Sequence, residues 1–220
     1  QKGLPTIARN LARGVARLAD PSAIVGPAPA YVVVMRLDLS GRTTRFAQDL
    51  AGSLRDDIGR STMVITERLI DDQLGVDPAA MRPGQPGYPR VLAWLHRVRA
   101  DHDVLVFVCD AARSEWTSSC LRQADRVLLV AQAGEDPALR AAEHDLAELS
   151  PSAQAPPVDL ILLQAHGIPQ ASGTPAWLAP RPTASVHHVR ADTPSDLAAA
   201  TRRIMGCAYG IAFAGSSTRA

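Results

Sequence analysis

The residues best placed to bind a phosphate group are Ser40-Gly41-Arg42-Thr43-Thr44, which follow a predicted strand and open a predicted helix. A phosphate-binding loop needs glycines that let backbone N–H groups surround the phosphate, a lysine for the outer phosphates and a Ser/Thr hydroxyl for Mg²⁺. The Gly-x-Thr-Thr ending is present, but Arg42 occupies the lysine position and no first glycine precedes the loop. The planar guanidinium does not simply replace an ammonium group. Gly41, Arg42 and Thr43 therefore indicate either a degenerate nucleotide site or a helix N-terminus with ordinary capping, and the missing parts favour the second.

Asp110 is the second candidate, because it follows the apolar run Val104–Val108. A carboxylate at the end of such a buried strand would hold Mg²⁺ through water in a nucleotide-binding protein. The alternative is an aspartate that caps the following turn. Since the phosphate loop is incomplete, the sequence favours the capping role and makes Asp110 the relic of a metal-holding acid.

Other catalytic or metal-binding groups have weaker support. The six histidines lack the spacing of a zinc site, and His187 and His188 would point to opposite faces of a strand. The nucleophile motif G-x-S-x-G is absent from the 220 residues. The three cysteines show no CxxC spacing and are predicted to be reduced. We expect no metal and no cofactor, and Trp116 is expected to be a packing residue.

The elements that would position these residues centre on Asp101–Gln132. Two apolar runs there, Val104–Val108 and Val127–Val130, flank a short amphipathic segment, which is typical of a parallel strand-helix-strand unit. Further strands are predicted at Tyr31–Leu37, Thr62–Thr66, Val158–Gln164, Ser185–Arg190 and Ala208–Phe213. Helices are predicted at Thr43–Ile58, Glu67–Leu74, Tyr88–Ala100, Pro137–Leu149 and Ser195–Met205. The proline-rich segments Val76–Pro89 and Gly167–Pro182 are expected to be irregular, apart from one turn at Pro175–Leu178.

This alternation predicts an α/β fold with an open, mostly parallel, doubly wound sheet in a three-layer sandwich. In such sheets, ligands lie beyond the carboxyl ends of the strands. The near-balanced charge of +1 argues against nucleic acid as a partner. No apolar stretch approaches the ~20 residues that span a bilayer. The cysteines, interpreted as reduced, predict a cytoplasmic protein, with any membrane association made through other domains of the whole protein. Because the chain begins at Gln1 and not at Met, it is expected to be part of a longer protein.

The segment Trp116–Leu139, WTSSCLRQADRVLLVAQAGEDPAL, with the preceding strand DVLVFVCD, resembles neuropathy-target-esterase-type patatin-like phospholipases. It is similar to their region between the cyclic-nucleotide-binding modules and the patatin catalytic domain. The terminal YGIAFAGSSTRA resembles the strand and glycine-rich loop that open the patatin domain. The middle of the chain also resembles ParA/MinD-type ATPases in its order of strands and helices, with a degenerate phosphate loop.

The resemblance implies three parts: residues 1–29 as a linker helix from a cyclic-nucleotide-binding module, 30–206 as a P-loop-like α/β domain, and 207–220 as the start of a patatin-like domain. It implies that the whole protein is a serine lipid esterase or lysophospholipase with a Ser-Asp dyad beyond Ala220. Gly215, Ser216, Ser217 and Arg219 would fall on its oxyanion loop. The serines and Ala220 depart from the family's glycines and restrict close backbone approach to an oxyanion.

The resulting hypothesis is a non-catalytic connecting and regulatory domain, whose partners are neighbouring domains of the same chain and, through the whole protein, membrane lipid. The alternatives are a nucleotide-binding switch that uses Gly41, Arg42, Thr43 and Asp110, or a pseudoenzyme module fused to a membrane transporter. A further alternative is a scaffold whose sheet serves as a dimerisation surface. The chemistry of this piece alone does not indicate an enzyme.

Overall fold

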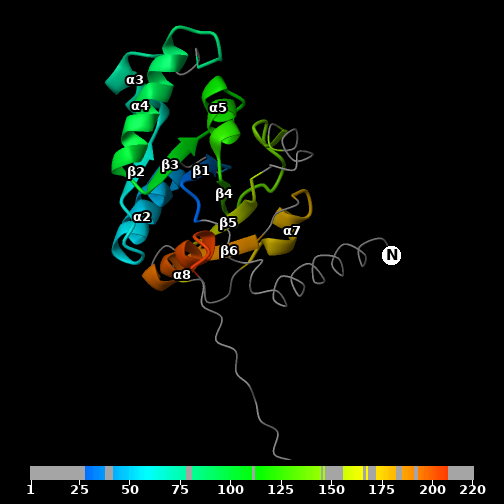
Figure 1. Ribbon diagram of the computed structural model, residues 1–220. Coiled ribbons are helices and arrows are strands. Elements are labelled where there is room, and N and C mark those ends of the chain that lie inside the picture. The colour runs from blue at the N-terminus through cyan, green and yellow to red at the C-terminus, as the bar shows by residue number, and fades with distance from the viewer. Residues whose placement is uncertain are drawn as a thin grey trace, which may run out of the picture. The chain divides into compact units, whose positions relative to one another are not determined.

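Six parallel strands form one sheet in the order β2-β3-β1-β4-β5-β6 (Figure 1). The computed structural model describes residues 28–37, 42–77, 81–110, 112–144, 146, 156–165, 167, 172–181, 185–190 and 193–207. The strands are β1 (Tyr31–Arg36), β2 (Thr62–Ile65), β3 (Val104–Cys109), β4 (Arg126–Gln132), β5 (Val158–Gln164) and β6 (Ser185–Arg190). The predicted doubly wound parallel sheet is confirmed, and over the described residues its strands are all parallel.

The central strands are apolar along their whole length because helices cover both faces of the sheet. In β1, Val33 and Met35 belong to one continuous hydrophobic cluster, whereas Val32 and Val34 are fully buried but lie outside it. Side chains of a strand alternate between faces, so these two pairs mark the two sides of the sheet. The uniform apolar run that predicted β1 therefore reflects two buried faces.

Helices α3 (Glu67–Leu74), α4 (Gly87–Asp101), α5 (Glu115–Gln123) and the short α7 (Thr174–Leu178) contribute buried residues to the cluster that holds Val33. Helix α2 (Arg42–Asp56) contributes none and contacts β1, β2 and β3, so it covers the opposite face. Helix α8 (Pro194–Ile204) follows β6. Helices on both faces complete the predicted three-layer arrangement.

The connections fix where a ligand site would lie. After β1 the chain moves towards β2, whereas after β4 it moves towards β5, on the other side of the sheet. Neighbouring parallel strands whose connections leave in opposite directions form a topological switch point, where ligands bind in α/β sheets. The carboxyl ends of β1 and β4 are therefore the place to examine.

Most predicted element bounds agree with the structure to within one or two residues, and Pro175–Leu178 forms most of α7. The predicted helix Pro137–Leu149 is wrong at its start, because residues 137–140 are not helical and helical geometry appears only at Glu143. The predicted strand Ala208–Phe213, the helix within residues 1–29 and the loop residues Gly215, Ser216, Ser217 and Arg219 lie outside the described residues.

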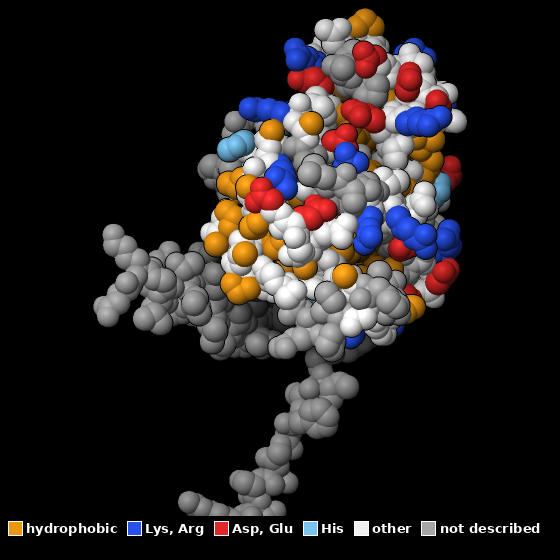
Figure 2. All heavy atoms as spheres, turned by 180° about the vertical axis from the view of Figure 1, so that it is seen from behind, with side chains coloured by type: hydrophobic (Ala, Val, Ile, Leu, Met, Phe, Trp, Pro, Cys, Tyr) orange, Lys and Arg blue, Asp and Glu red, His pale blue; other side chains and the backbone are white. Residues whose placement is uncertain are grey.

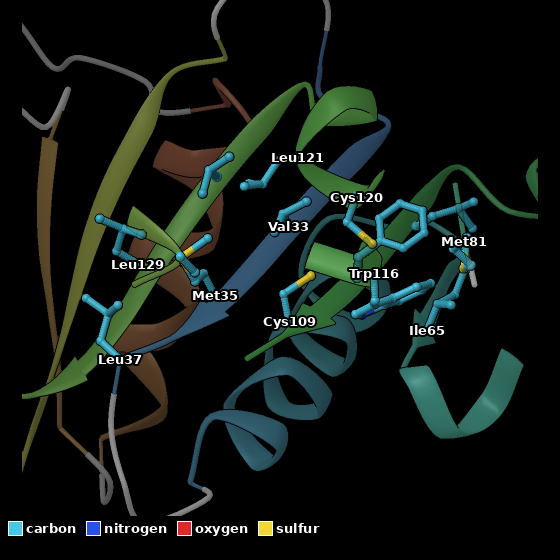
Figure 3. Packing of buried hydrophobic residues seen from close by; sticks show 14 of the residues in the cluster. Val33, Met35, Leu37, Ile65, Met81, Cys109, Trp116, Cys120, Leu121 and Leu129 are labelled. Carbon is cyan, nitrogen blue, oxygen red and sulfur yellow. The ribbon is translucent and has the colours of Figure 1, made fainter. Parts of the chain in front are cut away.

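The core around α5 contains the residue that the sequence marks as a packing anchor. Trp116 is 1 % exposed, its ring packs edge-on against Phe107, and its Nε1 donates to the carbonyl of Val108 at 3.0 Å. Figure 3 shows Trp116 beside Cys109 and Cys120, which come from β3 and α5. Both cysteines are buried and free, as predicted, and burial together with the neighbouring Cys109 raises the pKa of the Cys120 thiol. A buried thiol of this kind is unreactive.

Residues Pro29–Thr201 form one compact unit, and residues 1–28 with 202–220 form another. In the described part of the second unit, the chain leaves α8 through Gly206, which has φ 70°, and the N–H of Cys207 bonds to the carbonyl of Arg202. Within the described residues, no helix is long and apolar enough to cross a membrane. On the face seen in Figure 2, basic and acidic side chains are interspersed and form no continuous basic patch.

Candidate functional site at the switch point

The predicted phosphate loop is described only at its end. Gly41 lies outside the described residues, as does the side chain of Thr43. Arg42, the first residue of α2, has an exposed side chain whose Nη1 donates to Oε1 of Gln132 at 3.4 Å. Gln132 is the last residue of β4, so Arg42 reaches across the switch point. The bond is long, and it holds the guanidinium only weakly.

Asp110 lies next to an arginine that the sequence interpretation overlooked. Arg36, the last residue of β1, places Nη2 3.5 Å from Oδ1 of Asp110. The two residues meet because β1 and β3 are neighbours, with Met35 opposite Cys109. Both side chains are partly exposed, 34 % for Arg36 and 55 % for Asp110. At such exposure the pair stabilises the fold by at most ~1 kcal/mol, but it compensates the charge of the carboxylate.

A third guanidinium, that of Arg140, comes from the segment after β4 and covers the end of β1. Its Nε donates to the carbonyl of Leu37 at 3.4 Å, and its Nη2 donates to the carbonyl of Asp136 at 3.0 Å. Nη1 also lies 3.8 Å from the carboxylate of Asp136. Arg36, Arg42 and Arg140 thus surround the switch point together with two aspartates, and each arginine contacts a protein oxygen.

The same segment explains why the helix predicted from Pro137 starts late. The N–H of Ala138 donates to Oδ1 of Asp136, and the N–H of Arg140 donates to Oε1 of Glu143. The carbonyls of Pro137 and Ala138 accept from a distant arginine, Arg181. These contacts satisfy backbone groups that a first helical turn would otherwise use or leave free.

Arg181 is the best-satisfied polar side chain near the carboxyl ends of β4 and β5. It is 4 % exposed and makes five hydrogen bonds, which equals the five N–H donors of a guanidinium. Two go to the buried carboxylate of Glu143, at 2.6 and 2.9 Å, and three go to backbone carbonyls. Its guanidinium carbon lies 4.8 Å from the ring centroid of Trp177. We call Arg181, Glu143 and Trp177 the buried clamp.

The buried clamp joins the segment after β4 to α7, the helix after β5. Trp177 itself donates from Nε1 to the carbonyl of Ala133 at 3.3 Å. Nothing in the local sequence indicates this arrangement, because Glu143 and Arg181 are 38 residues apart and Arg181 lies in the proline-rich stretch. Its consequence is that the segment after β4, which borders the switch point, is held to the region after β5 by buried interactions.

Gly173 provides a test of how closely these two loops approach each other. It has φ 83°, and a Cβ atom on it would lie 2.7 Å from the carbonyl oxygen of Ala133. We expect Gly173→Ala to lower the free energy of unfolding by about 1–3 kcal/mol, from the strained φ and the backbone collision together. Urea denaturation measures this change.

The matched control is Gly52→Ala in α2, where no atom lies within 4 Å of the added Cβ. A helix-interior alanine there should stabilise the protein by roughly 0.5–1 kcal/mol. Equal effects of the two substitutions would contradict the close approach of the loops.

His187 and His188 point to opposite faces of β6, as predicted. His188 lies 3.0 Å from the amide of Gln164 and 3.0 Å from the hydroxyl of Thr174, and desolvation lowers its imidazole pKa. The neutral ring can accept the Gln164 N–H at Nδ1 and donate to Thr174 from Nε2, with the tautomer assigned from these partners. His188 therefore helps to fix α7 over β5 and β6.

Asp159, Ser185 and His187 bring together the residue types of a serine hydrolase, yet in an unproductive order. The Ser185 hydroxyl donates to the Asp159 carboxylate, and its Oγ lies 3.0 Å from Nε2 of His187. In a catalytic triad the imidazole lies between the acid and the serine. Asp159 is fully buried and also pairs with Arg126, so the group joins β4, β5 and β6 structurally.

An all-parallel sheet with this strand order and switch point defines an α/β domain of the P-loop-like class. The fold is similar to the crystal structure of a putative plasmid partition protein from Borrelia burgdorferi B31 bound to AMPPNP, with a TM-score of 0.50 and 11 % sequence identity. The match covers 81 % of this chain and 98 % of that chain. At this identity the likeness shows the fold alone, and it confirms the predicted ParA-like order of elements.

The chain belongs to the neuropathy target esterase family, whose P-loop like domain matches residues 32–209. It is 32 % identical to Lysophospholipase NTE1 of Candida albicans over 157 residues, which are 68 % of this chain and 10 % of that protein. A patatin-like phospholipase domain-containing protein of Caenorhabditis elegans is 31 % identical over 102 residues, or 46 % of this chain and 8 % of the relative. The chain thus spans about a tenth or less of these large relatives, and the resemblance seen in Trp116–Leu139 is confirmed.

Proposed function

We propose that the domain is a non-catalytic connecting and regulatory module of a patatin-like phospholipase, positioned between a cyclic-nucleotide sensor and the lipid hydrolase. Membership of the neuropathy target esterase family supports the setting. Within this proposal the whole protein is a cytoplasmic serine lipid hydrolase that meets membrane lipid through other domains. Gly215, Ser216, Ser217 and Arg219 are then positions on the oxyanion loop of the following domain.

The observation that carries the proposal is the ion pair between Arg36 and Asp110. In a nucleotide-binding protein of this fold, an acid at the end of β3 would hold Mg²⁺ through water. Here a guanidinium from the neighbouring strand faces that carboxylate at 3.5 Å. A cation brought to the same place would be repelled by Arg36. The arrangement supports the interpretation of Asp110 as a vestigial metal-binding carboxylate.

The buried clamp is a second, independent observation that supports the connecting role. Switch segments in nucleotide-binding proteins change between ordered and released states. The segment after β4 is instead tied to α7 through a carboxylate and a guanidinium that are both less than 10 % exposed. A rigid domain of this kind can transmit the position of one neighbouring domain to another, a role inferred from its place in the chain.

A calorimetric titration of the 220-residue chain with Mg-ATP and Mg-GTP tests the proposal against the nucleotide-switch alternative. We expect no saturable binding below millimolar nucleotide, because the loop lacks its lysine and first glycine and Asp110 is paired. The control is Arg42→Lys, which restores the lysine alone and should also fail to bind. Micromolar affinity that Asp110→Asn abolishes would establish the switch and overturn the non-catalytic connecting role.

A further inference from the structure

His188 connects β6 to β5 and α7 through hydrogen bonds that depend on how many protons its ring carries. Its Nδ1 lies 3.0 Å from Nε2 of Gln164, and its Nε2 lies 3.0 Å from Oγ1 of Thr174. Gln164 is the last residue of β5, and Thr174 is the first residue of α7. The imidazole therefore joins the sheet to the start of a helix of only 5 residues.

The orientation of the Gln164 amide is set on its other side by the backbone of Ser172. Its Oε1 accepts from the N–H of Ser172 at 3.4 Å, and its Nε2 donates to the carbonyl of Ser172 at 3.3 Å. Gln164 is 2 % exposed, so water offers its amide few replacement partners. With both Ser172 contacts in place, an N–H of Gln164 faces the imidazole, and Nδ1 of His188 has to accept it.

A proton on Nδ1 of His188 is incompatible with this arrangement. The imidazolium has a donor at each nitrogen, so its Nδ1–H would face the donor N–H of Gln164. Rotation of the amide by half a turn would restore that contact, but it would place N–H against N–H and oxygen against oxygen at Ser172. Either outcome removes hydrogen bonds from a buried amide, whereas the contact from Nε2 to Thr174 is kept.

The surroundings of His188 supply little compensation for a positive charge. On this face of β5, and throughout α7, no described residue is charged. On the same face of β6, Arg190 is paired with Asp196 of α8. Beyond α7, Arg181 is paired with Glu143. Desolvation lowers the pKa of the His188 imidazole below its ordinary value of 6.5, in agreement with this geometry.

The segment held by His188 depends on tertiary contacts for its structure. A helix as short as α7 is not stable in isolation, because too few hydrogen bonds offset the cost of its first turn. Gly173, between Ser172 and Thr174, lies close to the carbonyl of Ala133, which also accepts from Trp177. A loosening of this turn would therefore reach the segment after β4, which borders the switch point.

We propose that Gln164, Ser172, Thr174 and His188 form a proton-sensitive latch, which holds the start of α7 on the sheet while the imidazole is neutral. Uptake of one proton at Nδ1 breaks the contact of Gln164 with His188 or its contacts with Ser172, and loss of the proton restores them. The buried clamp does not involve this imidazole, so the change is a loosening of the start of α7 and not its release. The latch does not depend on the proposed connecting role, since it needs only the described domain.

Protonation of His188 is followed directly by NMR, through the Hε1 signals of the histidine rings, as the pH of the 220-residue chain is lowered. Because the pKa is lowered in the folded state, the stabilisation is complete above pH 6.5 and is lost as the pH falls through the pKa of the folded state. We expect His188 to titrate below pH 6.5, together with the amide signals of Ser172 and Thr174. Titration at or above pH 6.5, or without a change at these amides, would overturn the proposal.

His188→Asn assigns the His188 signal and tests the latch by amide hydrogen exchange. The variant has no titrating ring and keeps an acceptor near the position of Nδ1. Exchange of residues 172–178 is compared with the parent at the same pH, once at about pH 7.5 and once at about pH 5. Between these values, we expect protection to fall about two- to tenfold more in the parent, the effect of about one hydrogen bond. An equal fall in both proteins would contradict the latch.

Two matched controls separate the latch from a merely structural role of the histidine. Thr174→Ala removes the partner of Nε2, which carries its hydrogen in both protonation states, so protection should fall by the same factor at both pH values. His96→Asn replaces an exposed histidine of α4 and should leave the exchange of residues 172–178 as in the parent. A pH dependence abolished by His96→Asn would place the titrating group elsewhere and overturn the assignment.

Discussion

Substitution of Arg181 by alanine is expected to lower the free energy of unfolding by about 3–5 kcal/mol, the usual effect of breaking a buried ion pair. The loss is large because Glu143, 7 % exposed, would keep a buried charge without its partner. The backbone carbonyls of Pro137, Ala138 and Trp177 would lose their donor as well. Urea denaturation followed by tryptophan fluorescence measures the change directly.

Two controls test whether the loss of stability in Arg181→Ala comes from the unpaired buried charge. Replacing both partners, Arg181→Met with Glu143→Leu, should be less destabilising than Arg181→Ala, because no unpaired charge remains in the interior. Arg68→Ala removes an exposed pair with Asp72 and should change stability by about 0.5 kcal/mol or less. A midpoint for Arg181→Ala equal to that of Arg68→Ala would show that the clamp does not hold the two loops.

The second large effect is expected at Trp116. Trp116→Ala should cost about 3–5 kcal/mol, because it empties a fully buried site between α5 and β3 and removes the edge contact with Phe107. Trp116→Phe keeps most of the packing and loses the hydrogen bond to the Val108 carbonyl, so about 1–3 kcal/mol is expected.

Leu139→Ala is the control for removal of a large apolar side chain. Leu139 is 47 % exposed, and its truncation should change stability by about 0.5 kcal/mol or less. The thermal unfolding midpoints of the three variants rank them by stability. A Trp116→Ala protein as stable as the Leu139 variant would contradict the packing role assigned to Trp116.

The strands could be predicted from sequence because both of their faces are buried, which leaves uninterrupted apolar runs such as Val104–Val108. Trp116 was predictable as a packing residue for a related reason, since it lies between two such runs. The helix at Pro137 was mispredicted because its apolar periodicity is real, while its first backbone groups are satisfied by Asp136 and Arg181. A local sequence pattern cannot reveal that the carbonyl of Pro137 accepts a hydrogen bond from Arg181, which lies 44 residues further along the chain.

At the candidate site, too, residues marked by local sequence could be predicted, whereas contacts set by the fold could not. Asp110 and Arg42 were identified because their positions after a strand and before a helix can be read from the chain. Arg36 was overlooked because its meeting with Asp110 depends on which strands are neighbours, a property of the sheet order.

The central claim is that the switch point of this domain holds internal ion pairs and no nucleotide. A ligand that binds only the native state raises the unfolding midpoint, because it stabilises that state by RT ln(1 + [L]/Kd). The direct measurement is the thermal midpoint of the 220-residue chain against increasing Mg-ATP, repeated with Asp110→Asn. We predict that any shift is the same in both proteins. A concentration-dependent rise in the parent that Asp110→Asn abolishes would contradict the claim.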